Sequence, residues 1–543
     1  MFLDIRAVTS MQKVFLDEAP RAQLVAPEGF QNEVISYQLA YRLIDHTHPV
    51  YLTAEVDSPI AAYVSVRQVR HVPVDFPCYA VPDDNYVRKT PGLYPDRLSE
   101  IGPHTLRAYP TRWDTLWIEV DGKGELAAGQ YPVTVKLSAP DGTLLGVYTQ
   151  LITVLPGLLP EQKLIQTRWF YCDCLAEFYH VPVWSEEHWA IVENFVKTAV
   201  QHGVNMILTP VHTPPLDTRV DTERLTNQLV DVTVENGQYR FGMEKLHRWI
   251  DMCKRCGVEY YEVSHLFTQW GAQHAPKIMA TVDGVEKRIF GWDTDAAGEA
   301  YGAFLRAYIP ALREVFRAEG IDEYAWWHIS DEPGVQHLEH YQAAKAQVKE
   351  LLADARIMDA LSSYEFYRQG VVDHPVVASN HMDPFLENNV PNLWTYYCCG
   401  QHIGVSNGFI AMPGARTRIL GMQLFRYDIE GFLQWGYNFY KSQYSDYPVD
   451  PFAVTAADGF APAGDAFLVY PAPDGTAEVS MRLAHDRDAV QDLRAFELLA
   501  SLVGDEKAKE LVRDITLTEY PHDDEGLLAI RHAANRLIVE AMK

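Results

Sequence analysis

Short apolar runs alternate with helical patterns between residues 161 and 455, and this alternation limits the possible folds more than any other feature of the chain. It is typical of parallel βα units. The runs with the length of a strand are 163–171, 204–209, 258–263, 324–329, 357–362, 376–380, 392–397 and 431–437. The helical patterns are 185–202, 241–256, 296–318, 336–353, 414–427 and, placed to close the ring, 485–503. We therefore predict a (β/α)8 barrel that is irregular after its fifth and sixth strands, where the connections show little helical pattern.

The residues before this region have a different pattern. Alternating strands separated by turn residues, at 34–41, 61–66, 115–120 and 129–137, predict an antiparallel β-sandwich. The clearest hairpin turns at Asp141-Gly142, because this dipeptide readily adopts positive φ angles. Two prolines and a glycine at 155–160 indicate a linker. The predicted units are a β-sandwich domain at 1–157, a catalytic barrel at 158–455, and a C-terminal extension at 456–543 whose strand (466–470) and helices close or pack on the barrel.

Composition excludes several classes of partner. The chain of 543 residues has a net charge of −27, which repels phosphate backbones and anionic membranes and leaves a neutral glycoside or short oligosaccharide as the expected substrate. No apolar run reaches the roughly 18 residues of a membrane helix, and the start lacks the pattern of a signal peptide. Seven cysteines without a framework spacing favour free thiols and a cytoplasmic location. No phosphate-binding or nucleophile-elbow motif occurs, and we predict no cofactor.

Polar and aromatic residues gather where the predicted barrel strands end. Chemistry in such barrels lies at the carboxyl ends of the strands. Each residue alone could be a helix cap or a core residue. It is their occurrence together at the ends of several strands that indicates a binding site. The predicted substrate-binding residues are Trp169, Tyr171, His212, His265, His328, Asn380, Tyr396, Tyr397, Trp435 and Asn438.

Asp331 and Glu332 directly follow the fourth predicted strand. Two charged carboxylates about 5 Å apart repel by roughly 3 kcal/mol at an effective dielectric near 20, so one of them should keep its proton. A pKa raised to about 6 or 7 would suit a glutamic acid to general acid catalysis. Asp-Glu-Pro could instead cap the next helix, but its position in the barrel favours an active site.

The adjacency of the two carboxylates bears on the mechanism. Sequence neighbours rarely flank a scissile bond, so they fit a reaction in which the 2-acetamido group of the sugar attacks its own anomeric carbon. In that scheme Asp331 holds the acetamido N–H and Glu332 protonates the leaving oxygen. Tyr396 or Tyr397 is the candidate for binding the acetamido oxygen.

Three stretches together carry a resemblance to a known family: WWHISDEP at 326–333, LWTYYCC at 393–399 and GFLQWGYNFY at 431–440. They resemble the family 123 glycoside hydrolases, and the similarity continues through 465–471 and 485–503. The resemblance implies a retaining, exo-acting β-N-acetylgalactosaminidase, with the oxazoline-stabilising and acid/base roles falling on Asp331 and Glu332.

Other readings remain open at this point. The chain could act on a non-acetamido sugar with Asp173 or Asp383 as a separate carboxylate, or bind carbohydrate without cleaving it. His212, His265 and His381 have the chemistry of a metal site, but sugar binding is preferred and no metal is predicted. The pair Cys253 and Cys256 is expected on a packed helix face, and Cys172, Cys174, Cys398 and Cys399 are expected to be buried thiols.

Overall fold

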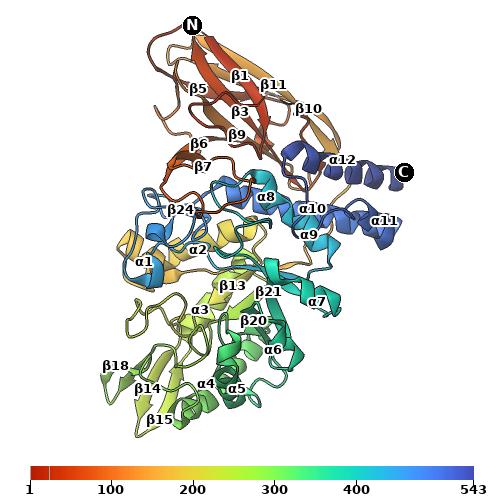
Figure 1. Ribbon diagram of the computed structural model, residues 1–543. Helices are drawn as coiled ribbons and strands as arrows, with labels where there is room; N and C mark the ends of the chain where they lie inside the picture. The colour runs from red at the N-terminus through yellow and green to blue at the C-terminus, as the bar shows by residue number, and fades with distance from the viewer. Residues whose placement is uncertain (1, 22, 24) are drawn as a thin grey trace.

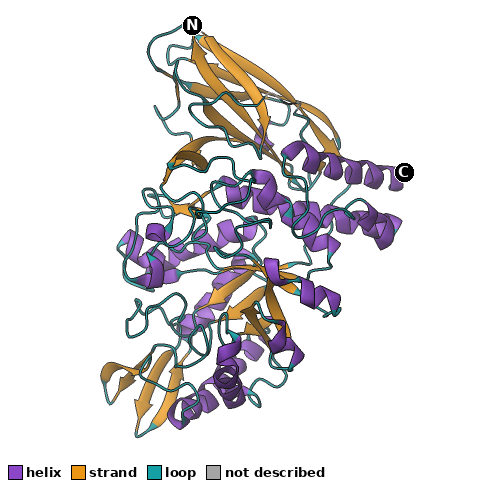
Figure 2. Ribbon diagram, viewed as in Figure 1, coloured by secondary structure: helices purple, strands orange, loops and turns teal. Residues whose placement is uncertain are grey.

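The computed structural model describes residues 2–21, 23 and 25–543. Strands from the N-terminal part of the chain form one end of the molecule, and the barrel strands lie toward its centre (Figure 1). Most of the long helices belong to the barrel or to the C-terminal region (Figure 2). Within the described residues, no helix combines the length and the apolar character needed to cross a membrane.

The N-terminal region is a β-sandwich, as predicted. One sheet has five strands in the order β1 (Phe2–Thr9), β3 (Val34–Ile44), β9 (Asp114–Asp121), β6 (Val64–Val74) and β7 (Gly92–Glu100). The other has β2 (Glu28–Phe30), β11 (Leu144–Leu155), β10 (Gly129–Ser138) and β5 (Thr53–Asp57). Strand β1 lies before the first predicted strand at 34–41, and β2 pairs parallel to β11 rather than antiparallel. The β10–β11 hairpin turns at Gly142, whose φ is 87°.

The barrel is closed, and each predicted run contributes a strand. In order around it stand β12 (Ile165–Arg168), β13 (Met206–Thr209), β16 (Tyr260–Val263), β19 (Ala325–Trp327), β20 (Arg356–Leu361), β21 (His374–Ala378), β22 (Trp394–Tyr396) and β23 (Gly431–Gln434). All neighbours are parallel, and β23 pairs with β12 to close the ring. Several strands end earlier than predicted because the chain turns there into the loops of the barrel mouth.

The helices show why the barrel is irregular on one side. Those predicted between the strands are α2 (Glu186–Gln201), α3 (Glu244–Cys256), α4 (Glu299–Ala318) and α5 (Leu338–Val348). After the fifth and sixth strands come only the short α6 (Tyr364–Arg368) and α7 (Asp383–Glu387), as expected from the weak pattern there. The helix predicted at 414–427 is divided into α8 (Gly414–Arg418) and α9 (Leu420–Arg426).

A small sheet outside the barrel was not predicted. It has the order β15 (Gln238–Gly242), β14 (Asp231–Glu235), β17 (Ile278–Val282) and β18 (Val285–Phe290), and it forms the end of the molecule opposite the sandwich (Figure 1). Its hairpins turn at Asn236-Gly237 and Asp283-Gly284, the dipeptides that tight hairpins favour. Strand β15 occupies the residues at which the helix was predicted to begin.

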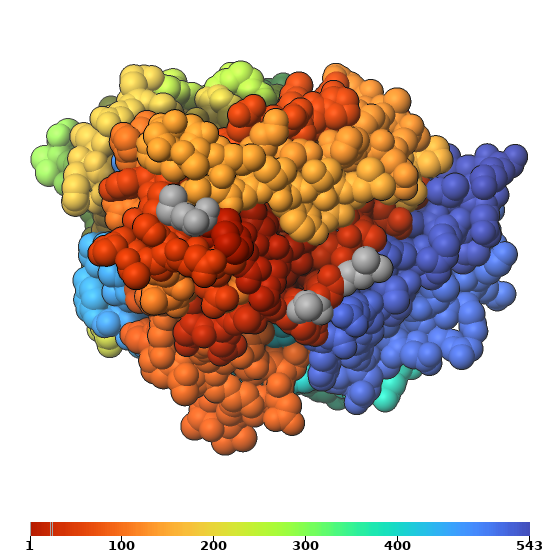
Figure 3. All heavy atoms as spheres, turned by 90° about the horizontal axis from the view of Figure 1, so that it is seen from above, coloured from red at the N-terminus to blue at the C-terminus, as the bar shows by residue number. Residues whose placement is uncertain are grey.

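The C-terminal region joins the barrel to the sandwich. It contains β24 (Val469–Pro471), β25 (Ala477–Val479), α10 (Met481–Val503), α11 (Asp505–Glu510) and α12 (Asp524–Ala541). Helix α10 was expected to close the ring, but β23 and β12 do so, and α10 packs on α8, α9 and β7. The C-terminal helices lie against the N-terminal strands in the space-filling view (Figure 3).

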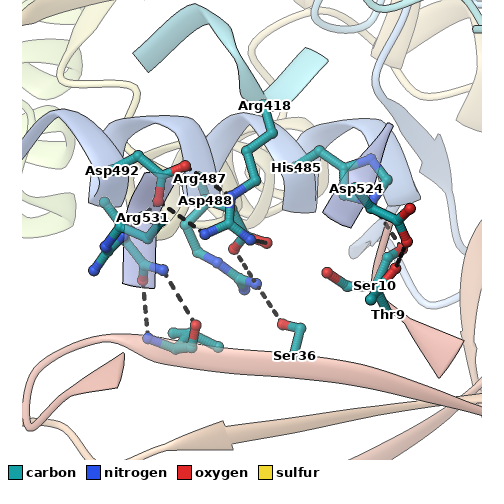
Figure 4. A network of polar contacts seen from close by, with 12 residues as sticks. Thr9, Ser10, Ser36, Arg418, His485, Arg487, Asp488, Asp492, Asp524 and Arg531 are labelled. Atoms are coloured by element: carbon teal, nitrogen blue, oxygen red, sulfur yellow. Dashed lines mark hydrogen bonds and ion pairs between the residues drawn. The ribbon is translucent and has the colours of Figure 1, made fainter. Parts of the chain in front are cut away.

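Buried charged residues of α10 face the sandwich. Arg487 donates to Glu119 on β9 at 2.8 Å and to Ser36 on β3 at 3.0 Å. Arg531 on α12 pairs with Glu33 at 2.7 Å. It also pairs with Asp492 on α10 (Figure 4). Because each of these charges has an opposite partner, the contact between barrel and sandwich leaves little charge buried alone.

Candidate active site

A pocket opens at the carboxyl ends of the barrel strands. Strand ends or the loops after them supply its wall from β12, β13, β16, β19, β20, β22 and β23. The lining residues are Trp169, Tyr171, Leu216, Asp217, Gln269, Trp270, Asp331, Glu332, Ala360, Tyr396, Cys398, Cys399, Leu433, Trp435 and Phe460. The wall is thus largely aromatic and apolar, with a few carboxyl groups.

Asp331 and Glu332 stand together on this wall, but their side chains differ in environment. Asp331 is buried, whereas Glu332 is exposed toward the pocket. Glu332 has a φ of 42°, an unusual value for a residue with a long side chain, and its N–H donates to Ala360 O at 3.1 Å. The hydroxyl of Tyr396 donates to Glu332 Oε1 at 2.6 Å. The backbone bond and the tyrosine together hold the glutamate in this strained conformation.

The proton of the pair is drawn to Asp331. Burial, and next the charge of Glu332, raise the pKa of Asp331 well above its usual range. Within the described part of the chain, no side chain or backbone group donates to its carboxyl oxygens, so they are free to meet a ligand. The sequence argument assigned the proton to the glutamic acid. The structure gives the buried position to the aspartic acid instead.

His328 lies below the pocket in a buried charged triad. Its Nε2 is 2.7 Å from Glu262 Oε1 and its Nδ1 is 3.2 Å from Asp359 Oδ1. Burial disfavours the charged imidazole, but the hydrogen bonds to Asp359 and Glu262 outweigh it and raise the pKa of His328 to about 9. His265 stacks on His328 with 4.0 Å between ring centroids, and burial lowers the pKa of His265 well below its usual value. A charged and a neutral imidazole therefore lie face to face.

Several predicted site residues do line the pocket: Asp331, Glu332, Trp169, Tyr171, Tyr396 and Trp435. Their polar atoms are held in place by neighbours. Trp169 Nε1 donates to Glu262 Oε1 at 2.7 Å, and Tyr171 Oη donates to Trp435 O at 2.9 Å. Trp435 Nε1 donates to Asp465 Oδ2 at 2.8 Å, so its ring is fixed at the wall.

The other predicted residues do not line it, because they pack or hydrogen-bond elsewhere in the fold. His212 Nε2 lies 2.8 Å from His265 O, and His265 and His328 stack beneath the pocket. Asn438 hydrogen-bonds both ways with the backbone of Tyr171. The residues left outside the pocket are His212, His265, His328, Asn380, Tyr397 and Asn438.

Two of these residues lie outside the pocket for opposite reasons: Tyr397 is buried in the core, and Asn380 is exposed at the surface. Tyr397 is buried and packs on Phe432. The centroid of its ring lies 6.0 Å from the Arg168 guanidinium carbon. Asn380 is exposed and accepts from Gln401 Nε2 at 2.9 Å. Successive residues at a strand end point to opposite sides, so Tyr396 faces the pocket and Tyr397 does not.

The carboxylates proposed for a separate-nucleophile reaction lie outside the pocket. Asp173 is buried and pairs with Arg224 at 2.8 Å and with Lys441 at 3.2 Å. Burial opposes its charge, but Arg224 and Lys441 outweigh it and lower the pKa of Asp173 to about 2. Asp383 is exposed at the start of α7. The further carboxyl that does line the pocket is Asp217, which the sequence analysis missed.

The cysteines and histidines form no metal centre. Across residues 2–21, 23 and 25–543, no group of three metal-ligating side chains is found, and His381 lies exposed beside Asn380. All seven cysteines are free. Cys253 is buried on α3 as expected, and Cys172 and Cys174 are buried, but Cys398 and Cys399 are only half-buried at the pocket wall.

The pocket residues fall within the match to a known family. The family model for the catalytic domain of glycoside hydrolase 123 matches residues 169–499. The chain belongs to glycoside hydrolase family 123. This match includes Asp331, Glu332 and every strand of the barrel except the first, so the protein is a hydrolase of glycosidic bonds and takes a carbohydrate substrate.

Structural comparison agrees with the family 123 assignment. A family 123 glycoside hydrolase from Clostridium perfringens, solved in a study of glycolipid glycan hydrolysis, shares the fold over 100% of this chain and 98% of its own, with 11% identity and a TM-score of 0.75. A family 5 mannosidase from Rhizomucor miehei covers 67% of this chain and 97% of its own at 12% identity, with a TM-score of 0.33. A Parabacteroides merdae β-glucuronidase covers 85% of this chain and 50% of its own at 11% identity, with a TM-score of 0.30. Comparison with curated protein sequences finds no match.

Proposed function

We propose that this family 123 hydrolase is a retaining, exo-acting β-N-acetylgalactosaminidase in which the 2-acetamido group of the substrate is the nucleophile. The observation that carries the proposal is that Asp331 and Glu332 are consecutive residues on one wall of one pocket. A retaining enzyme with its own nucleophile needs two carboxyls about 5 to 5.5 Å apart on opposite sides of the scissile bond. Neighbours on one wall are better arranged to serve the acetamido group and the leaving oxygen.

The proposed reaction has two steps. The acetamido oxygen attacks the anomeric carbon, the bond from that carbon to the leaving oxygen breaks, and Glu332 gives its proton to that oxygen. Asp331 accepts a hydrogen bond from the acetamido N–H and stabilises the positive oxazolinium. Water then attacks the anomeric carbon, the bond from that carbon to the acetamido oxygen breaks, Glu332 takes a proton from the water, and the sugar leaves with its original configuration.

The proton count of the pair supports this scheme. With the pKa of Asp331 raised by burial and by Glu332, the two carboxyls hold one proton between them. Positive charge developing on the acetamido nitrogen favours a charged Asp331, which leaves the proton on Glu332. The cationic His328 below also lowers the pKa of Asp331.

Tyr396 is the tyrosine that we propose for the acetamido oxygen. It lines the pocket, whereas Tyr397 does not. The hydroxyl of Tyr396 donates a hydrogen bond to Glu332. When Glu332 carries the shared proton of the pair, this hydroxyl would donate to the acetamido oxygen instead.

The substrate that we propose is a short, neutral glycoside. The pocket is lined by aromatic side chains and a few carboxyl groups, which suits the faces and hydroxyls of a single terminal sugar, in keeping with action at chain ends. The seven free cysteines support a reducing, cytoplasmic setting, where short imported glycosides are available.

A thiazoline fused to carbons 1 and 2 of N-acetylgalactosamine tests the mechanism directly. It mimics the oxazoline, so we expect competitive inhibition at least about 100-fold tighter than the KM of an aryl substrate. An enzyme with its own nucleophile gains nothing from this mimicry, and inhibition no stronger than that by the free sugar would refute the acetamido mechanism.

Asp217 gives one reason to keep a second candidate, a glycosidase with a separate carboxylate. It lines the same pocket as Glu332. Were it the nucleophile, a 2-fluoro glycoside would label Asp217 covalently and Asp217→Asn would lose activity on every substrate. Peptide mapping after incubation with that reagent decides between the two candidates.

A further inference from the structure

We infer that Asp217 binds a hydroxyl group of the sugar in the pocket and selects the substrate by the configuration of that hydroxyl. This inference rests on the proposed glycosidase site, but it holds whether or not the sugar carries an acetamido group.

Three loops of the barrel mouth meet at Asp217. Its N–H donates to Gln269 Oε1, in the loop after β16. From the loop after β23, the N–H of Tyr444 donates to Asp217 Oδ2 at 3.0 Å, and Ser445 Oγ donates to Asp217 O at 2.7 Å. Asp217 has a φ of 38°, in the left-handed region that aspartate tolerates better than most residues, and these bonds hold it in that conformation.

A buried charge network supports the residue from below. Arg224 Nη1 donates to the carbonyl of Leu216 at 2.9 Å, directly before Asp217 in the chain. The same guanidinium pairs with Asp173, which also binds Lys441 at 3.2 Å. Asp173 therefore has a structural part in the site: it fixes the arginine that positions the loop.

One carboxyl oxygen of Asp217 is left for a ligand. Oδ2 is used by Tyr444, whereas Oδ1 has no hydrogen-bond partner in the described part of the chain. The residue is 9% exposed and lines the pocket, so its remaining exposure is directed into that space. An oxygen that is accessible from the pocket and has no protein donor can accept a hydrogen bond from a sugar hydroxyl.

The chemistry of the pocket suits a hydroxyl at this point. Burial raises the pKa of Asp217 to about 6, so it is a carboxylate at neutral pH and accepts hydrogen bonds only. The neighbouring wall at Trp169, Leu433 and Phe460 is apolar and would cover the faces of a sugar ring. An acceptor fixed in position beside apolar groups discriminates one ring hydroxyl from its epimer.

Asp217→Asn compared with the wild type on a set of aryl glycosides tests the inference. The set is the parent sugar and its 3-, 4- and 6-deoxy analogues. Asparagine has nearly the same volume and keeps an acceptor for the N–H of Tyr444. We expect kcat/KM to fall about 10- to 100-fold on the parent sugar and not to fall on at least one deoxy analogue, because that analogue lacks the hydroxyl that Asp217 binds.

Asp446→Asn is the matched control. Asp446 pairs with Arg219 at 2.8 Å at the edge of the same loops and does not line the pocket. A substitution that only loosens the loop would change kcat/KM by the same factor for all four substrates. We expect that uniform pattern for Asp446→Asn and not for Asp217→Asn.

An equal loss on all four substrates in Asp217→Asn, or no loss on any, would overturn the inference. Failure of the proposed function looks different: the wild type would then cleave galactosides as well as acetamido sugars. In that case the substrates are aryl galactoside and its deoxy analogues, and the same comparison of kcat/KM between wild type and Asp217→Asn tests the role of Asp217.

Discussion

Asp331 is buried while its neighbour Glu332 is exposed to the pocket, and this difference decides how the pair divides its proton. Burial raises the pKa of Asp331 before the charge of Glu332 raises it further. A carboxyl whose pKa is raised in the folded protein lowers the free energy of unfolding at any pH where the unfolded carboxyl is ionised. The buried position of Asp331 therefore destabilises the fold near neutral pH.

Asp331→Asn should therefore stabilise the protein. Below about pH 4 the carboxyl is neutral in both the folded and the unfolded chain and contributes no difference. As the pH rises above that value, the unfolded carboxyl ionises while the folded one resists, and the folded state is penalised until its own pKa is passed. We expect a melting temperature higher by on the order of 1 to 3 °C at pH 7, with the gain disappearing toward pH 4.

Asp173→Asn is the control with the opposite sign. The pKa of Asp173 is lowered to about 2 because Arg224 and Lys441 outweigh its burial. Its stabilising contribution is present above about pH 4 and is lost as the pH falls toward 2. The substitution leaves the buried Arg224 without a carboxylate and Lys441 with Glu177 alone, so we expect a loss of about 3 to 5 kcal/mol. Stabilisation in both variants, measured by thermal unfolding from pH 4 to 7, would contradict these assignments.

The loss of kcat in Glu332→Gln should depend on how strongly the leaving group needs a proton. We expect kcat to fall about 100- to 10,000-fold for an alkyl or sugar leaving group, which needs the proton. A dinitrophenyl leaving group needs no proton, so its first step should be nearly unchanged. The measurement is kcat against leaving-group pKa; a loss that is the same for all leaving groups would remove Glu332 from the role of acid.

The sequence identifies only part of this site. Asp331 and Glu332 could be predicted because they follow a buried strand directly. Asp217 lies in a long loop eight residues beyond β13, and only tertiary contacts with Gln269 and Tyr444 bring it to the pocket. The histidines were misplaced for a related reason: a polar residue near a strand end can point below the mouth as well as into it.

At the scale of elements, the apolar runs predicted every barrel strand because buried parallel strands have a strong pattern. The small outer sheet was missed because its strands are short and residues 241–256 also fit a helix, although β14 and β15 alternate polar and apolar residues. The two Asn-Gly and Asp-Gly turns were the available signal.

Helix α10 is unusual in burying charged residues on several sides. Arg482 donates to both oxygens of Asp96 on β7, each at 2.9 Å, and both side chains are buried. Arg482→Met removes the cation and leaves Asp96 with Lys13, whose Nζ is 3.8 Å away. We expect a loss of about 3 to 5 kcal/mol.

Arg513→Met is the comparison for an exposed ion pair. Arg513 pairs with Glu510 at the surface near α11. Exposed pairs contribute about 0 to 1 kcal/mol, so the melting temperature should hardly change. Equal shifts in the two variants would show that the α10 pair is not a buried structural contact.

At the scale of the whole molecule, the sandwich also reaches the pocket wall. The connection between β6 and β7 packs on the loop after β22: Arg416 pairs with Asp83 at 2.8 Å, and Tyr86 Oη donates to His402 O at 2.9 Å. In the same region the rings of Tyr79 and His402 are 4.6 Å apart. The wall that carries Cys398 and Cys399 is thus backed by the N-terminal region.

Residues 158–543 expressed alone should not fold. Without the sandwich, Arg482, Arg487 and Arg531 lose Asp96, Glu119 and Glu33, and the apolar surface around these contacts would be exposed to water. We expect insoluble or unfolded protein by circular dichroism, and recovery when residues 1–157 are supplied on a second chain. A stable, active barrel without the sandwich would contradict this view of the interface.

The most direct test of the account compares two aryl glycosides that differ only at carbon 2, on the wild type and on Asp331→Asn. Substrate assistance predicts that the wild type cleaves the N-acetyl-β-galactosaminide and leaves the β-galactoside intact, and that Asp331→Asn loses about 100-fold or more in kcat on the first. Equal turnover of the two glycosides by the wild type, with Asp331→Asn unaffected, would contradict the central claim that the substrate supplies the nucleophile and Asp331 stabilises it.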